Sequence, residues 1–177
     1  MRRPDLAVSL LLLLAACQRP DERTPDERAE VANSDSSLER AAIESGLVAD
    51  VDRVSPIGLY QRRHEAGRDQ LCIVPDGPNR FRFGMEVMFG ANEWCRGRGT
   101  ARRAGDKLIM RFPGDRCTIV AQYDGDRIAT PGVLDLNCAA LCESRGSLEG
   151  VTFPRLADGR AAAVNARNAD GDALCGQ

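Results

Sequence analysis

Residues 81–89 alternate between apolar and other side chains, and this stretch constrains the fold more than any other part of the sequence. The odd positions are all apolar, whereas the even positions include arginine, glycine and glutamate. Alternation with a period of two is typical of a β-strand with one buried face. We therefore expect a strand here, whose buried face carries Phe81, Phe83, Met85, Val87 and Phe89.

Shorter runs of the same kind lie on both sides of this stretch and are separated by turn sequences. Asp124-Gly-Asp126 is the best hairpin signal, because Asp-Gly tolerates the positive φ angles of a tight turn. Short strands at this spacing indicate a mainly β domain, an antiparallel meander that closes as a small barrel or folds as a sandwich. Residues 136–144 are expected to form a helical turn instead. The other expected strands are 57–64, 70–74, 107–112, 117–123, 127–130 and 151–153.

Length and composition fit one small domain. The chain has 177 residues, of which only 5% are aromatic, so the core must be small. The formal net charge of -2 argues against a nucleic-acid-binding protein, which normally carries a basic excess. We expect the folded β domain to span residues 54–155.

The amino-terminal segment has a basic start, Met1-Arg2-Arg3, and an apolar run over residues 6–16 that ends in Leu14-Ala15-Ala16-Cys17. The run is shorter than the roughly 20 apolar residues that cross a bilayer, and it has the length of a signal-peptide core. The segment resembles the lipobox of bacterial lipoproteins. The resemblance implies that residues 1–16 are a signal peptide, that Cys17 carries a diacylglycerol and that its new amino terminus is acylated, so that the protein is anchored in a lipid bilayer.

The residues after Cys17 indicate a tether. In the sorting pattern of enterobacterial lipoproteins, Asp after the cysteine retains the protein in the inner membrane. Gln18 at that position implies the outer membrane, with the protein facing the periplasm. Pro20-Asp-Glu-Arg23 is repeated as residues 25–28, and few residues up to 37 could be buried, so we expect a disordered tether within 17–53. The capping-box form of Ser36-Ser-Leu-Glu39 predicts a short helix that ends at Gly46.

Setting Cys17 aside leaves an even number of cysteines. An exported chain meets an oxidising compartment, so three disulfides are expected to staple the β domain. The spacing of Cys138 and Cys142 would loosely suit a metal site, but no second close pair and no nearby histidine supports one. On one helical turn these two cysteines would reach separate strands, and Cys175 would pin the tail at 156–177. The six disulfide candidates are Cys72, Cys95, Cys117, Cys138, Cys142 and Cys175.

Few residues in the chain could support catalysis. His64 is the single histidine and Lys107 the single lysine, and neither lies in a known catalytic motif. We therefore expect no enzyme activity, no cofactor and no metal. The alternative is a carboxylate-dependent hydrolase acting on cell-wall glycans, which would need two acids about 5–10 Å apart. The acids within the expected domain are Glu65, Glu86, Glu93, Glu143 and Glu149.

Arginine is the distinctive residue type, because 23 of the 24 basic residues are arginine. Guanidinium groups bind carboxylates and phosphates through two parallel hydrogen bonds. A cluster at the cell envelope could therefore bind an anionic glycan or lipid, or an acidic envelope protein. The candidates, which crowd around the central strands with Arg111 close by, are Arg80, Arg82, Arg96, Arg98, Arg102 and Arg103.

Two further resemblances bear on the β domain. Gly58-Leu-Tyr60 is similar, over these three residues, to the opening strand of lipocalin-like and avidin-like barrels. The layout of acylated cysteine, tether and small β domain is similar to that of periplasmic lysozyme-inhibitor lipoproteins and small barrel protease inhibitors. Their inhibitory loop motifs are not found in this chain. The resemblance implies a non-enzymatic domain for binding or structural support, and as its sharper form an inhibitor of a periplasmic hydrolase.

Overall fold

The computed structural model describes residues 37–47, 50, 53–114 and 117–175. The chain divides into two compact units, residues 1–48 and 49–177. Within the first unit, residues 37–44 are helical. Gly46 then takes a positive φ of 72°, and Leu47 donates its N–H to the carbonyl of Ala42, which is a common way for a helix to end. The predicted short helix is confirmed over the described residues, whereas the lipobox and the repeat lie outside them.

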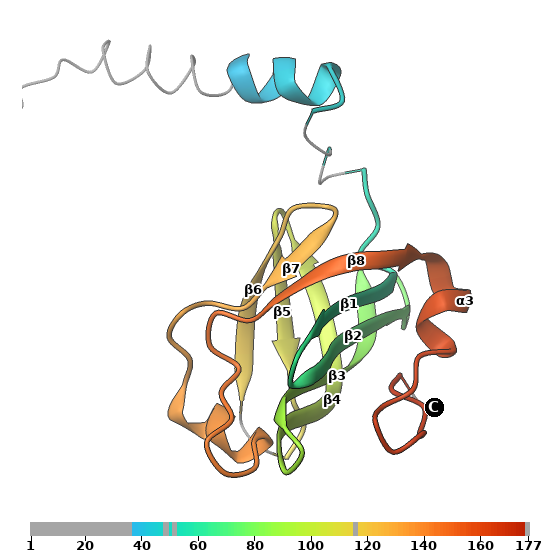
Figure 1. The fold of residues 1–177 in the computed structure, drawn as a ribbon. Coiled ribbons are helices and arrows are strands. Elements are labelled where there is room, and N and C mark those ends of the chain that lie inside the picture. The colour runs from blue at the N-terminus through green and yellow to red at the C-terminus, as the bar shows by residue number, and fades with distance from the viewer. Residues whose placement is uncertain (1–36, 48–49, 51–52, 115–116, 176–177) are drawn as a thin grey trace, which may run out of the picture. The chain divides into compact units, whose positions relative to one another are not determined.

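The second unit is a closed barrel of eight antiparallel strands, each paired with its neighbour in sequence and with β8 returning to β1 (Figure 1). Between barrel and sandwich, the structure selects the barrel. The β6–β7 turn lies at Asp124-Gly-Asp126 as predicted, with a φ of 95° at Gly125. The strands are β1 (Gly58–His64), β2 (Gly67–Pro75), β3 (Arg80–Gly90), β4 (Glu93–Ala104), β5 (Lys107–Arg111), β6 (Thr118–Tyr123), β7 (Arg127–Ala129) and β8 (Thr152–Asp158).

The interior is filled by the inward residues of these strands. In β3, Phe81, Phe83, Met85 and Val87 are all buried, as the alternation predicted, and Phe89 at the end of the row is 39% exposed. The rest of the core includes apolar side chains from each of the remaining seven strands, which fill the interior of this small barrel.

Strand β4 was not predicted, although it is the longest strand. Its inward positions include Gly97 and Gly99, so the alternation lacks the large apolar residues that mark a strand. A Cβ on Gly97 would lie 2.4 Å from the ring of Phe112. That ring meets Phe83 edge to face at a centroid distance of 4.9 Å. The glycines therefore make room for two aromatic rings in the core.

Three disulfides staple the barrel, as predicted, and they join Cys72 to Cys175, Cys95 to Cys142 and Cys117 to Cys138. The 3₁₀ helix η2 (Leu136–Leu141) is the predicted helical turn in the β7–β8 connection. Cys138 lies within η2 and Cys142 directly follows it, and the two cysteines reach separate parts of the barrel. Two bridges thus hold this connection against the end of the barrel.

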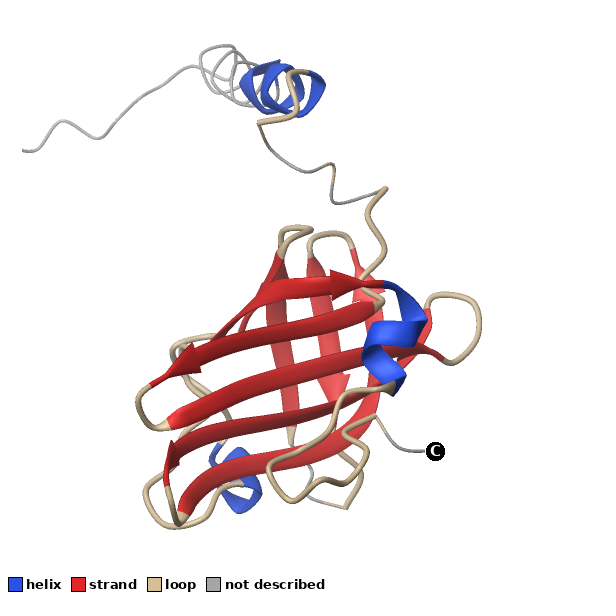
Figure 2. Cartoon of the chain, turned by 45° about the vertical axis from the view of Figure 1, so that its right-hand side comes forward, coloured by secondary structure: helices blue, strands red, loops and turns tan. Residues whose placement is uncertain are grey.

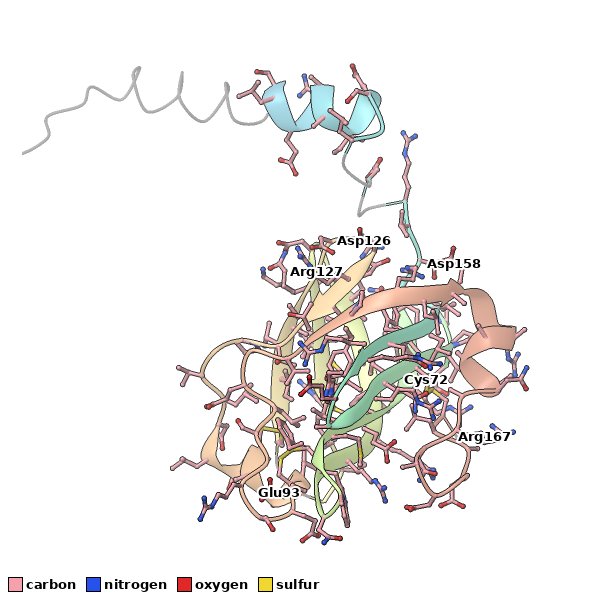
Figure 3. All side chains as sticks on the ribbon, in the orientation of Figure 1. Cys72, Glu93, Asp126, Arg127, Asp158 and Arg167 are labelled. Atoms are coloured by element: carbon pink, nitrogen blue, oxygen red, sulfur yellow. A yellow bond between two sulfur atoms is a disulfide. The ribbon has the colours of Figure 1, made fainter. Side chains whose placement is uncertain are left out.

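The carboxyl-terminal segment continues the barrel fold beyond residue 155, where we expected the domain to end. Strand β8 runs to Asp158, and α3 (Gly159–Val164) packs against β1 and β2. Ala163, Ala166 and Leu174 form a second apolar cluster on the outer side of the barrel, where Cys72 of β2 bonds to Cys175 (Figures 2 and 3). We call residues 165–175 the strap.

One end of the barrel is closed by the segment that precedes β1. Arg155 lies over the ring of Tyr60, with its guanidinium carbon 4.7 Å from the ring centroid, and donates to the hydroxyl of Tyr123 at 2.8 Å. Tyr123 in turn donates to the carbonyl of Val54, and Arg155 donates to that of Ser55. Figure 3 shows the labelled Asp126 and Arg127 at this end and Glu93 at the other.

We predict that this tyrosine cluster makes the barrel less stable in alkali. Burial raises the pKa of both Tyr60 and Tyr123, although Arg155 acts in the opposite direction. In the unfolded chain the tyrosine hydroxyls lose their protons at about pH 10, whereas in the folded barrel they still retain them at that pH. The free energy of unfolding should therefore be unaffected by these groups below about pH 10 and fall as the pH rises above it.

Tyrosinate absorbance measures this directly, because these are the two tyrosines of the chain. Folded protein should show less tyrosinate than urea-unfolded protein at the same alkaline pH, because the pKa of both tyrosines is raised in the barrel. In Tyr60→Phe, the alkaline loss of stability should be smaller, since only Tyr123 remains. Ionisation of both folded tyrosines near their ordinary pKa would contradict the prediction.

Candidate functional site

The outer surface of β3–β6 carries two parallel rows of side chains that face away from the core. Each row crosses four strands through directly paired residues, and the rows lie about 7 Å apart along the strands. We call these eight residues the arginine face. The first row is Arg80, Arg102, Ile109 and Val120, and the second is Arg82, Thr100, Arg111 and Thr118.

Two arginines of this face oppose each other directly. Arg80 on β3 pairs in register with Arg102 on β4. The Cβ atoms of opposite residues lie about 5 Å apart, and like charges in that arrangement destabilise a sheet. Both residues are exposed. Barrel stability therefore does not account for this pair, whereas a shared anionic ligand would.

A pocket of about 210 Å³ lies over this part of the sheet. Among its described lining residues, the one carboxylate is Asp76, from the β2–β3 turn. Its Oδ1 atom lies 3.6 Å from Nε of Arg82, and its backbone carbonyl accepts a hydrogen bond from Arg80. Among the described residues, no carboxylate forms an ion pair with Arg102 or Arg111. The pocket is lined by Asp76, Arg80, Thr100, Ala101, Arg102, Ile109 and Arg111.

The chemistry of this arrangement suits an anion with several oxygen atoms. Guanidinium groups present rigid donor pairs that match phosphate and carboxylate oxygens. The hydroxyl of Thr100 lies between Arg82 and Arg111 in the second row and can donate or accept a hydrogen bond. The sequence did not predict three members of this site, Thr100, Ile109 and Val120. Their positions beside the arginines follow from the strand pairing around β4, which the sequence did not predict as a strand.

Arg96 and Arg98 have a different role, because they hold the strap. Nε of Arg96 lies 2.6 Å from Oε1 of the buried Glu86, and its Nη1 lies 2.5 Å from Oδ2 of Asp170. Arg98 donates to the backbone carbonyls of Ala173 and Leu174. These two guanidiniums are therefore engaged within the domain and do not belong to the arginine face.

Arg103 also lies apart from the arginine face. Its side chain donates to the carbonyls of Val54 and Gly105 and lies over the ring of Tyr123, at 5.4 Å from the centroid. It therefore belongs to the closed end of the barrel. Of the six arginines predicted from sequence, the structure brings together Arg80, Arg82 and Arg102, and adds Arg111.

The buried carboxylates lie elsewhere and are held by basic and backbone groups. Asp69 accepts hydrogen bonds from Arg62 at 2.7 Å and from the N–H of Met88 at 3.0 Å, and its Oδ1 lies 2.9 Å from Nε2 of His64. Of the five glutamates considered from sequence, Glu86 is buried, and its second oxygen accepts the N–H of Ala169. Asp69 was not predicted, because nothing in the sequence shows that its strand position is buried.

Cys17 lies outside the described residues, so its predicted lipid attachment stays a prediction. In the part of the chain that the structure describes, no cluster of three or more His, Cys, Asp or Glu side chains could hold a metal ion. No helix within that part is long and apolar enough to span a membrane. No family model, no curated protein and no solved structure matches this chain.

Proposed function

We propose that this protein is a lipid-anchored envelope protein whose barrel is a non-enzymatic module that binds an anionic component through the arginine face. The observation that carries the proposal is the direct opposition of Arg80 and Arg102 beside Arg111, at a pocket whose described lining includes one carboxylate. The core is packed with side chains, so recognition would occur on the outside of the barrel.

The glycan-hydrolase alternative has less support. A carboxylate pair that cleaves glycosidic bonds needs one acid free to donate a proton and another free to attack or to activate water. The two buried carboxylates, Asp69 and Glu86, already contact arginine and backbone donors. An inhibitor of a periplasmic hydrolase is a special case of the binding proposal, in which the bound anion is a carboxylate of the partner enzyme.

The anchor is part of the proposal and rests on the lipobox resemblance at Cys17. Fatty-acid labelling and membrane fractionation of the full chain, compared with Cys17→Ala, test it. Labelling of the variant at the level of the parent chain would reject the anchor.

We expect the full chain, in a neutral detergent, to bind inorganic phosphate at the arginine face. The signals of arginine Nε–H groups in NMR should report the titration, with the largest shifts at Arg80, Arg102 and Arg111. Arg102→Gln should weaken binding by about tenfold or more, because a hydrogen bond to a charged group contributes about 1.5–3 kcal/mol. The variant should be at least as stable as the parent chain, since it removes a like-charge pair.

The matched control is Arg63→Gln, which removes an exposed arginine on β1 far from the arginine face in the strand order. Phosphate binding should be unchanged in this variant. Equal losses in both variants would mean that the effect is one of total charge, and the proposed site would then be rejected.

A further inference from the structure

We infer that the arginine face docks on the headgroups of an anionic lipid surface, the same membrane in which the chain is anchored. This inference rests on the proposed function, because it names the anion as a lipid phosphate. Three features of the chain support a lipid surface as the occupant: apolar residues within the face, the local charge, and the length of chain that leads to Cys17.

The apolar residues lie in the same row as the opposed arginines. Arg102 pairs with Ile109, and Ile109 pairs with Val120, which is 48% exposed. A site for a small soluble anion has no use for an exposed valine beside its guanidiniums. At a membrane interface, apolar side chains contact the acyl boundary, while arginines bind phosphates with their long side chains extended.

The charge of the face differs in sign from that of the chain. Among the described residues, this face has four guanidiniums and the pocket over it has one carboxylate, Asp76, whereas the whole chain carries a net charge of -2. Each basic residue near an anionic leaflet favours binding by about fivefold. The rest of an acidic protein is repelled by the same surface. This asymmetry would select the orientation in which the arginine face meets the lipid.

The length of chain after the proposed anchor keeps the barrel close to the membrane. Residues 18–53 separate Cys17 from the start of the barrel segment at Val54. With residues 37–44 helical and the rest disordered, as the sequence predicts, this segment would have an end-to-end distance of about 30 Å. Tethering at that distance makes docking effectively intramolecular, so weak contacts suffice for a large bound fraction.

The experiment uses the full chain in vesicles of phosphatidylcholine alone or with phosphatidylglycerol. The anchor is the same in both samples, so that only the lipid charge differs. Accessible arginines are modified with a dicarbonyl reagent, and the modified positions are mapped by mass spectrometry. Modification of Arg80, Arg102 and Arg111 should slow by about tenfold or more in the anionic vesicles, given the charge effect above. Arg63 serves as the internal control and should be modified equally in both, and high salt should remove the protection.

The outcomes separate the two proposals. If inorganic phosphate protects the three arginines but anionic vesicles protect no better than neutral ones, the lipid inference is overturned and the anion site stands. If neither protects them, both are overturned. Val120→Asn should reduce protection by anionic vesicles about threefold, through lost apolar contact. Equal protection of parent and variant in vesicles would overturn the lipid surface as the occupant.

Discussion

Replacing Gly99 with valine is expected to destabilise the barrel by about 3 kcal/mol or more, a large part of the 5–15 kcal/mol that holds a typical domain folded. A Cβ at this position would lie 2.0 Å from the backbone carbonyl oxygen of Arg111 and 3.0 Å from the ring of Phe83. A backbone atom in a paired strand cannot move aside as a flexible side chain could. The β4–β5 pairing would therefore have to shift, and the core around Phe83 would open.

Gly90→Val is the matched control for this prediction. Gly90 ends strand β3, and a Cβ built there meets no atom within 4 Å. Valine favours strands more than glycine does, so this variant should be as stable as the parent chain or slightly more stable. Urea unfolding followed by the fluorescence of Trp94, the single tryptophan, measures both variants. Similar midpoints for the two would show that β4 does not pack as described.

Loss of the Cys72–Cys175 bridge is expected to be the most damaging of the three possible disulfide losses. The bridges span 103, 47 and 21 residues for Cys72–Cys175, Cys95–Cys142 and Cys117–Cys138, respectively. Loop entropy in the unfolded chain then predicts losses of about 4.7, 4.0 and 3.3 kcal/mol. The three loops are nested, so an inner bridge shortens the effective loop that each outer bridge closes. The three losses of stability should therefore differ by less than these values, in the same order.

Three double variants, each with one cysteine pair changed to serine, test this ranking by urea unfolding of the full chain. In the Cys72/Cys175 variant, the backbone amides of the strap should also exchange their hydrogens faster than the amides of the barrel. Without the bridge, the strap is held by noncovalent contacts alone, such as those of Arg98 and Glu86 with its backbone. If the Cys117/Cys138 variant lost the most stability, the unfolded-chain explanation would be wrong for this protein.

The strands that could be predicted from sequence are those whose inward residues are large. In β3 the alternation of Phe81, Phe83, Met85 and Val87 reports burial directly, and the Asp-Gly turn marks the β6–β7 hairpin. Strand β4 has glycine where the barrel needs space, so its strongest signal is the alternation of arginines on the other side. A strand that contributes room to the core leaves no apolar pattern to find.

The candidate site was predictable as a group of arginines but not as a geometry. The sequence places Arg96, Arg98 and Arg102 on one side of the same strand, and nothing local separates their roles. Their roles differ because the strap, some 70 residues later, bonds to Arg96 and Arg98, whereas Arg102 pairs with Arg80 and Ile109 on the arginine face. The partner of a surface arginine is thus decided by tertiary contacts between distant segments.

The pairing of β8 with β1 has a consequence for how any protein could bind. In the described barrel every strand pairs with a neighbour on both sides along at least part of its length, so no strand offers a complete free edge to which a peptide could add as a further strand. The same closure protects the folded domain from edge-to-edge aggregation. A protein partner would therefore be recognised mainly by side chains, and its specificity can change through surface substitutions that leave the hydrogen-bonded framework intact.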